Sequence, residues 1–148
     1  MSRVETSIWI DAPPKAVWET ALDPAMLEQW VTIHRDLHSA PEFPLKVGDR
    51  VEQTLALRGA PFKVTWKVAE CEAPSTAVWE GAGPARSRAI TRYSLKAEKK
   101  GTRFSYVNEF IPPGGVVGRV AAGALVGGLP ESEAKASLKL LKKLVEGR

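Results

Sequence analysis

Cysteine and histidine are both scarce in this sequence of 148 residues. Cys71 is the only cysteine, and His34 and His38 are the only histidines. A single cysteine excludes an internal disulfide, so packing must hold the fold together, and we expect a cytoplasmic protein. Cys71 lies between Glu70 and Glu72, whose charges are expected to raise its pKa and leave the thiol unreactive. The two histidines lack a third ligand at a recognisable spacing, so we predict no metal site.

Long apolar runs are also missing. The N-terminal segment has one arginine and no apolar run of the length that a signal peptide needs. The most apolar stretch, residues 114–129, is shorter than the ~18 residues of a membrane-spanning helix and contains Arg119, so we predict no membrane span. The sequence has neither a phosphate-binding loop nor a dinucleotide fingerprint, and we predict no cofactor. The length fits one domain that covers residues 1–148.

The N-terminal third combines one strand with two short helices. Alternating residues predict a strand over residues 3–10, and a helix is expected to follow it. Asp11 is the expected cap of that helix, and the prolines at 13 and 14 suit its first turn. A second short helix is expected over residues 26–30, followed by a strand or an irregular segment over residues 32–39.

The middle of the chain alternates between apolar and polar residues, and turn signals divide it. Strands are expected at residues 51–57, 62–68, 77–81, 88–96 and 103–110. After them the pattern is helical, and its last part places Ala134, Leu138, Leu141 and Val145 on one face. A run of strands with helices at either end of the chain indicates an α+β fold. Because only one face of the predicted sheet is apolar, we expect other elements to pack on that face alone. The C-terminal helix is the only expected element long enough to cover that face.

Positive charge gathers in one region of a chain whose net charge is +4. Residues 86–103 hold seven basic side chains and one acidic one. Arg88, Arg92 and Lys96 alternate with inward-facing positions, which is typical of the solvated outer face of a sheet. Nucleic-acid binding usually adds exposed aromatic residues or a helix that enters a groove. The aromatic residues here are expected on the opposite face, so we do not expect a nucleic-acid partner.

Several blocks of sequence resemble a known superfamily. They are SIWIDAPPKAVWETALDPAMLEQW, VGDRV, FKVTWKVAECEAPSTAVWEG and SLKLLKKLVE. With them the whole chain resembles the START-like superfamily, also called the helix-grip or Bet v 1-like fold, and within it the polyketide cyclase/dehydrase-type (SRPBCC) branch. The resemblance implies a seven-stranded curved antiparallel sheet that wraps around a long C-terminal helix, with two short helices after its first strand. Members of the superfamily bind lipids, polyketides or other hydrophobic molecules between the sheet and that helix.

The distribution of small and large residues also predicts a cavity between the sheet and the C-terminal helical region. The helical segment before Pro130 is rich in alanine and glycine, whereas the strands expected to face it carry large aromatic residues. Small side chains opposite large ones can interdigitate fully, or they can leave an apolar void that binds apolar ligands. Some polar residues, with Glu80 among the candidates, are also expected to face inward, and they need partners there. We predict ligand contacts from His34, Gln53, Leu55, Val64, Trp66, Thr91, Tyr93, Phe104, Tyr106, Asn108, Phe110, Val120 and Ala124.

Three functions remain open at this point. The first is a carrier or sensor that binds a hydrophobic lipid, polyketide or aromatic molecule. The second is a cyclase- or dehydrase-type enzyme, in which His34, Tyr106 and Asn108 polarise a carbonyl; His34 is the one candidate for acid–base catalysis. The third rests on the segments WVTIH and FKVTW, which resemble an actinobacterial subgroup described as toxins of type II toxin–antitoxin modules. That resemblance implies an antitoxin protein as partner.

Overall fold

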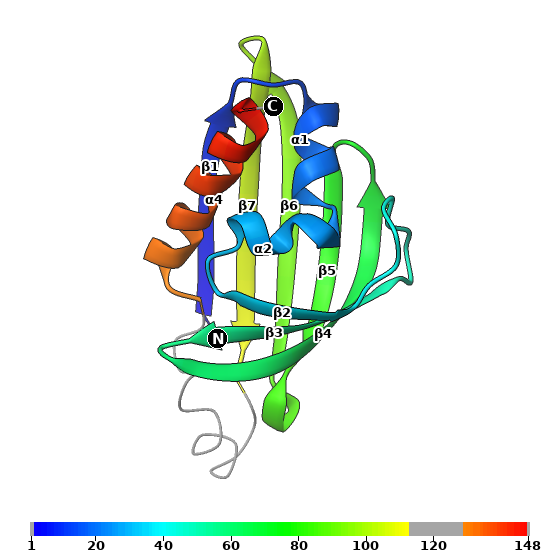
Figure 1. Cartoon of the computed structure of the whole chain (residues 1–148), viewed down its shortest axis with the longest axis vertical. Helices are drawn as coiled ribbons and strands as arrows, with labels where there is room; N and C mark the ends of the chain where they lie inside the picture. The colour runs from blue at the N-terminus through cyan, green and yellow to red at the C-terminus, as the bar shows by residue number, and fades with distance from the viewer. Residues whose placement is uncertain (1, 113–128, 148) are drawn as a thin grey trace.

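The computed structural model describes residues 2–112 and 129–147 of the chain (Figure 1). The described residues form one antiparallel sheet of seven strands in the order β1-β7-β6-β5-β4-β3-β2, together with several helices. The strands are β1 Ser2–Ile10, β2 His34–Ser39, β3 Arg50–Leu57, β4 Ala60–Glu72, β5 Thr76–Ala82, β6 Arg88–Glu98 and β7 Gly101–Ile111. The strands β1 and β2 follow one another in the chain but lie at opposite edges of the sheet.

Short helices bridge these two edges. They are α1 Pro14–Ala21, the 3-10 turn η1 Pro24–Met26 and α2 Leu27–Trp30. The sequence predicted Asp11 as the cap of α1, which is wrong: Pro13 occupies the cap position and provides no side-chain bond. Instead, the backbone N–H of Asp11 donates to Glu146 at 2.8 Å. Asp23 does act as a cap, because its carboxylate accepts from the Ala25 amide at 3.0 Å and starts η1.

The helix α4, Glu131–Glu146, lies across the inner face of the sheet beside β1 (Figure 1). Its buried face carries Ala134, Leu138, Leu141 and Val145, as the helical spacing predicted. A further 3-10 turn, η2 Pro84–Arg86, joins β5 to β6. The predicted α+β helix-grip architecture is therefore confirmed.

The predicted sheet faces are also confirmed. Phe104 and Phe110 on β7 are buried, and Arg92 on β6 is exposed. Glu109 of β7 forms ion pairs on the outer face with Arg92 at 3.6 Å and with Arg3 at 3.5 Å. Because side chains alternate along a strand, a slip of one residue would exchange the two faces. Apolar burial on a single face thus sets the register that positions the site.

Candidate functional site

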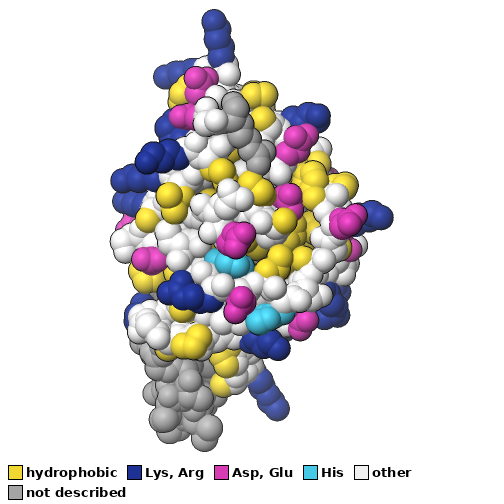
Figure 2. Space-filling view, in the orientation of Figure 1, with side chains coloured by type: hydrophobic (Ala, Val, Ile, Leu, Met, Phe, Trp, Pro, Cys, Tyr) yellow, Lys and Arg dark blue, Asp and Glu magenta, His cyan; other side chains and the backbone are white. Residues whose placement is uncertain are grey.

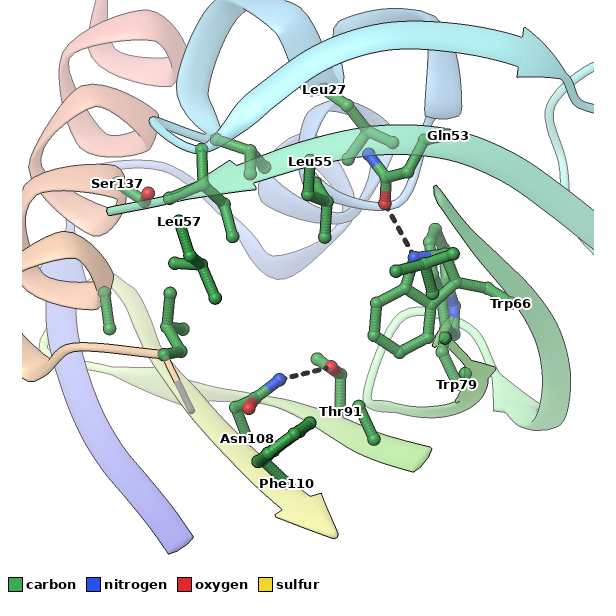
Figure 3. A pocket seen from close by; sticks show the side chains of 18 of the residues that line it. Leu27, Gln53, Leu55, Leu57, Trp66, Trp79, Thr91, Asn108, Phe110 and Ser137 are labelled. Carbon is green, nitrogen blue, oxygen red and sulfur yellow. Dashed lines mark hydrogen bonds between the residues drawn. The ribbon is translucent and has the colours of Figure 1, made fainter. Parts of the chain in front are cut away.

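A cavity lies between the inner face of the sheet and the helices α2 and α4 (Figure 3). It has a volume of about 100 Å³, counted as the space in which the centre of a water molecule can move. By this measure one water needs roughly 10–15 Å³, so the cavity has room for more than a single water. Its lining is mostly aliphatic and aromatic, with a few polar groups. The charged residue among the described lining residues is Arg88, which is exposed and which the alternation had placed on the outer face. Such a site favours an apolar molecule that carries few hydrogen-bonding atoms.

One polar group on the wall is a pair formed by β3 and β4. The indole N–H of Trp66 donates to Gln53 Oε1 at 2.6 Å (Figure 3). Behind this pair, Gln53 Nε2 lies 2.9 Å from His34 Nδ1 on β2. Gln53 and Trp66 are both buried, and the strand register places Gln53 beside Val64 and Trp66 beside Val51. The side-chain amide of Gln53 therefore connects Trp66 in the cavity wall to His34 on the edge strand β2.

A second polar group lies on β6 and β7. The side-chain amide of Asn108 donates to Thr91 Oγ1 at 3.1 Å (Figure 3). Tyr106 lies beside both: burial raises its pKa to about 12, against a smaller lowering by hydrogen bonds with Thr91 and Asn108. Burial, followed by the neighbouring Tyr106, also raises the pKa of Tyr93. Both phenols are therefore uncharged at neutral pH.

Aromatic rings form a continuous row along the sheet side of the cavity. The ring centroids of Trp66 and Trp79 are 6.2 Å apart, those of Trp79 and Tyr93 5.7 Å, and those of Tyr93 and Tyr106 5.8 Å. Gly81 makes room for this row, because a Cβ atom there would lie 2.7 Å from the Trp66 ring. The planes of neighbouring rings meet at 59°, 74° and 54° in the same order, so the row combines tilted and edge-to-face contacts.

Hydrogen bonds fix the first turns of α4 over the cavity. The backbone N–H of Thr32 donates to Ser137 Oγ at 3.0 Å, and the hydroxyl of Thr32 donates to Glu133 Oε2 at 2.6 Å. Ser137 is itself a lining residue. The segment between α2 and β2 is thereby tied to the helix that covers the sheet.

Most of the residues predicted to contact a ligand do line the cavity. They are Gln53, Leu55, Val64, Trp66, Thr91, Tyr93, Tyr106, Asn108 and Phe110. His34 lies behind the wall instead, because it belongs to the edge strand, and among the described residues Gln53 links its ring to the site. Phe104 is fully buried between the rings of Trp30 and Tyr93, with centroid distances of 6.3 and 6.0 Å. Val120 and Ala124 lie outside the described residues.

Sequence reasoning missed some of the lining and misplaced one residue. Trp30, Trp79 and Ser137 line the cavity but were not predicted. The signal for Trp79 was present, since it is the middle residue of the alternating inward set Ala77, Trp79 and Gly81. The same alternation shows why the expectation for Glu80 was wrong: its side chain is exposed, on the outer face.

Cys71 is half-buried, and its thiol donates to the carbonyl oxygen of Leu45 at 3.5 Å. Its pKa is raised, in the predicted direction, but the cause differs from the prediction. Burial is the larger cause and the charge of Asp49 the smaller, rather than the adjacent glutamates. A raised thiol pKa leaves little thiolate at neutral pH.

The outer face of the sheet carries charges of both signs. Lys67 pairs in register with Glu80, and Arg103 forms an ion pair with Glu98 at 2.9 Å. Together with the Glu109 pairs, these contacts place acidic groups among the basic ones. Within residues 2–112 and 129–147, no cluster of three potential metal ligands occurs. No helix in those ranges is long and apolar enough to cross a membrane.

Comparisons with known proteins agree on the fold. A family model described as polyketide cyclase / dehydrase and lipid transport matches residues 1–146. A protein of Thermus thermophilus has a crystal structure that aligns with a TM-score of 0.76 at 19% identity, covering 98% of this chain and 97% of that one. A protein of Chromobacterium violaceum aligns with a TM-score of 0.71 at 20% identity, with coverage of 98% and 97%. At these identities the likeness shows the fold alone.

Two curated proteins of Mycobacterium tuberculosis are similar in sequence. They come from the strains CDC 1551 / Oshkosh and H37Rv, and each is 26% identical over 136 residues. The match covers 89% of this chain and 93% of each relative, and both relatives are named as toxins.

Proposed function

The chain belongs to the polyketide cyclase / dehydrase and lipid transport family, and from that premise we propose that it binds an uncharged, largely apolar small molecule in its cavity. The observation that carries the proposal is the lining itself. Trp66, Trp79 and Tyr93 form an aromatic wall, and the polar lining groups are mostly neutral amides and hydroxyls, with the exposed Arg88 as the charged exception. An apolar cavity of this kind gains little from water and binds apolar ligands instead.

Buried indole groups support a ligand that also carries oxygen. The N–H groups of Trp30 and Trp79 are buried, and neither has a hydrogen-bond partner in the described part of the chain. A buried donor without an acceptor costs about 1–3 kcal/mol. A carbonyl or hydroxyl oxygen on the bound molecule would supply the missing acceptor. The preferred ligand is thus an aromatic or aliphatic molecule with one or two oxygen atoms.

A carrier or sensor role is favoured over an enzyme. Among the described lining residues there is neither a carboxylate nor a histidine. Tyr106, with a pKa of about 12, stays protonated at neutral pH and cannot act as the base. His34, the candidate for acid–base catalysis, lies behind the wall, and in the described part of the chain it is linked to the cavity through Gln53. Binding needs none of these groups to ionise.

A toxin-like role with a protein partner is a second candidate. It rests on the two Mycobacterium tuberculosis relatives, whose names describe them as toxins. Co-expression with the product of the neighbouring reading frame, followed by gel filtration, tests it. Co-elution at a fixed ratio would support the role, and separate elution would count against it.

Native mass spectrometry of freshly purified protein tests the ligand proposal first. We expect an added mass that is lost on denaturation. A thermal-shift series with a fatty acid, a sterol and an aromatic polyketide follows. A bound ligand at a hundredfold excess over its dissociation constant stabilises the fold by about 2.7 kcal/mol. In a domain of this size that raises the melting temperature by several degrees.

A matched pair of variants on β6 localises the binding. Ala89 lines the cavity, whereas Ala97 is exposed near the other end of the same strand. Ala89→Phe fills the cavity and is expected to abolish the ligand-induced shift. Ala97→Phe makes the same chemical change outside the cavity and should keep the shift. The proposal fails if the wild-type protein carries no added mass and none of the three ligand classes shifts its melting temperature.

A further inference from the structure

A path of hydrogen bonds leads from the edge of the sheet to the cavity wall. It begins at His34, which is half-buried on β2, and passes through Gln53, which is 4% exposed. It ends at Trp66, which lines the cavity (Figure 3). The two steps measure 2.9 Å from His34 Nδ1 to Gln53 Nε2, and 2.6 Å from Gln53 Oε1 to Trp66 Nε1. The histidine side chains reach the molecular surface in Figure 2.

The chemistry of the three groups fixes the direction of this path. An indole N–H can only donate, so the Gln53 atom that faces Trp66 must be the amide oxygen. The amide nitrogen therefore faces His34, and an amide nitrogen can only donate as well. His34 Nδ1 must then be the acceptor and carry no proton. The path thus requires the neutral ring with its proton on Nε2.

A second proton on His34 is incompatible with the path. The charged ring donates from both nitrogens, so its Nδ1–H would point at the N–H groups of Gln53. Turning the amide by half a turn gives His34 an acceptor, but it then places the amide nitrogen against the N–H of Trp66. In either orientation one buried donor loses its acceptor, and a buried donor without an acceptor is costly.

We infer that His34 is a positioning residue for the cavity: its neutral ring holds the Gln53 amide and thereby the Trp66 indole, and its protonation weakens ligand binding. The inference rests on the proposed ligand-binding function and adds a pH dependence to it. Trp66 is the point of action, because its ring belongs to the aromatic row of the wall. A displaced Trp66 changes the shape of the cavity without any change in the lining sequence.

The charges around His34 oppose one another, and burial decides the balance. Burial lowers the pKa of His34 most strongly, and the charges of Arg35 and His38 lower it further. Glu28 on α2 and Asp36 on β2 raise the pKa. The residues of β3 at this register, 53–55, are uncharged. The ring is therefore neutral at pH 7. It gains its second proton only at a pH below the usual pKa of histidine.

His38 provides an internal control on the same strand. Its Nε2 lies 2.6 Å from Thr54 Oγ1, and both side chains are outside the cavity lining. A hydroxyl can donate or accept, so Thr54 can turn to suit either charge state of the ring. Protonation of His38 should therefore leave the cavity unchanged.

The test begins with the ligand-free protein. The ¹H–¹⁵N signal of the Trp66 indole, identified by its loss in Trp66→Phe, is followed from pH 7.5 to pH 5. We expect the signal to move with the titration of the His34 ring. His34→Asn keeps an acceptor near the Nδ1 position but does not titrate, and its Trp66 signal should stay in place. His38→Gln should behave as the wild type does. A Trp66 signal that stays in place in the wild-type protein while the His34 ring titrates overturns the inference, and no variant is needed for that result.

The same pH series then measures the affinity for N-phenyl-1-naphthylamine, an uncharged fluorescent probe of apolar cavities. Loss of one hydrogen bond predicts roughly a threefold to tenfold weaker affinity at pH 5 than at pH 7.5 in the wild type. His34→Asn should give a nearly constant affinity. Probe binding that does not change with pH overturns the inference and leaves the proposed function standing. A moving Trp66 signal without any probe binding supports the hydrogen-bond path and counts against the proposed function.

Discussion

The two ends of the fold differ in how tightly side chains pack between the sheet and the helix α4. At one end, Ile10, Val17, Leu22, Phe104 and Leu141 are at most 1% exposed and belong to one buried apolar cluster. We call this the packed end. At the other, which we call the cavity end, Leu57 and Phe110 form a small separate cluster beside the cavity. In Figure 1 the packed end lies around α1 and the last turns of α4.

The partners of the polar groups explain the difference. At the packed end, side chains bond to backbone: Thr102 Oγ1 donates to the Ala12 carbonyl and Trp9 Nε1 to the Glu98 carbonyl, both at 2.7 Å. At the cavity end the polar groups on the strands of the wall bond to each other through side chains, as Asn108 does to Thr91. A backbone partner is fixed by the sheet, whereas a side-chain partner can turn toward a ligand. The polar groups of the cavity end are therefore the ones that a ligand of the proposed kind could engage.

The largest difference should appear when the same aromatic residue is removed from each end. Phe104 and Phe110 lie on the same face of β7, six residues apart. Phe104→Ala is expected to lower the free energy of unfolding by about 3–5 kcal/mol, because its fully packed surroundings cannot collapse. Phe110→Ala should cost clearly less, because its neighbours already border open space. Urea unfolding of the two variants measures both values, and equal losses would remove the distinction between the ends.

A smaller difference is expected when each end gains one methyl group at a glycine. In Gly101→Ala the new Cβ atom would clash with the carbonyl oxygen of Ile10 and approach the Trp9 ring to 2.7 Å. The backbone there cannot retreat, so a loss of about 1–3 kcal/mol is expected. In Gly81→Ala the atoms nearest to the new Cβ atom belong to side chains, those of Trp66 and Val64. Its stability loss should be smaller, but the displaced Trp66 should weaken ligand binding. A Gly81→Ala protein that binds normally would contradict this account of the wall.

The smallest effect concerns a surface contact at the packed end. Glu146 accepts from the Asp11 amide at 2.8 Å and from Lys142 at 2.7 Å, and these contacts lower its pKa. A lowered pKa in the folded state adds stability above the unfolded pKa, and that stability is lost as the pH falls through the folded pKa. Glu146→Gln should therefore cost less than about 1 kcal/mol at pH 7 and nothing at low pH.

Glu19→Gln is the matched control for that variant. Glu19 forms an ion pair with Lys15, one turn away on α1, at 3.2 Å. Glu19→Gln should have almost no effect on stability at pH 7 or at pH 3, because this ion pair lies within one helix and joins no distant segments. Thermal unfolding at pH 7 and pH 3 separates the two variants. Equal effects would show that the Glu146 contacts do not fasten α4 to the end of β1.

The sheet faces could be predicted because each strand alternates and only one face is buried. Gln53, Thr91 and Asn108 were identified as inward-facing polar residues on otherwise apolar faces, and all three line the cavity. That reasoning needs only a period of two and one-sided burial. It holds for every central strand where no turn or bulge interrupts the alternation.

His34 escaped the same reasoning for a physical reason. It lies on an edge strand whose pairing with β3 shifts between His34 and Asp36 and again between Leu37 and Ser39. Each shift changes which side a residue faces, and no local pattern announces it. The fully buried position of Phe104 was equally hidden, because it depends on Trp30 from a helix far away in sequence. Local periodicity shows which face a residue occupies, but tertiary packing decides whether that face borders a cavity.

The strand order also has a consequence for the newly made chain. Ser2–Ile10 pairs with residues 102–110, so β1 is synthesised long before its partner exists. At about 5 to 20 residues per second, β1 waits roughly five to twenty seconds for β7 to leave the ribosome. An unpaired strand is a template for pairing with another chain, and charged side chains oppose such pairing. Arg3 and Glu5, which are exposed on β1 in the finished fold, are therefore expected to keep the nascent strand apart from other copies until β7 arrives.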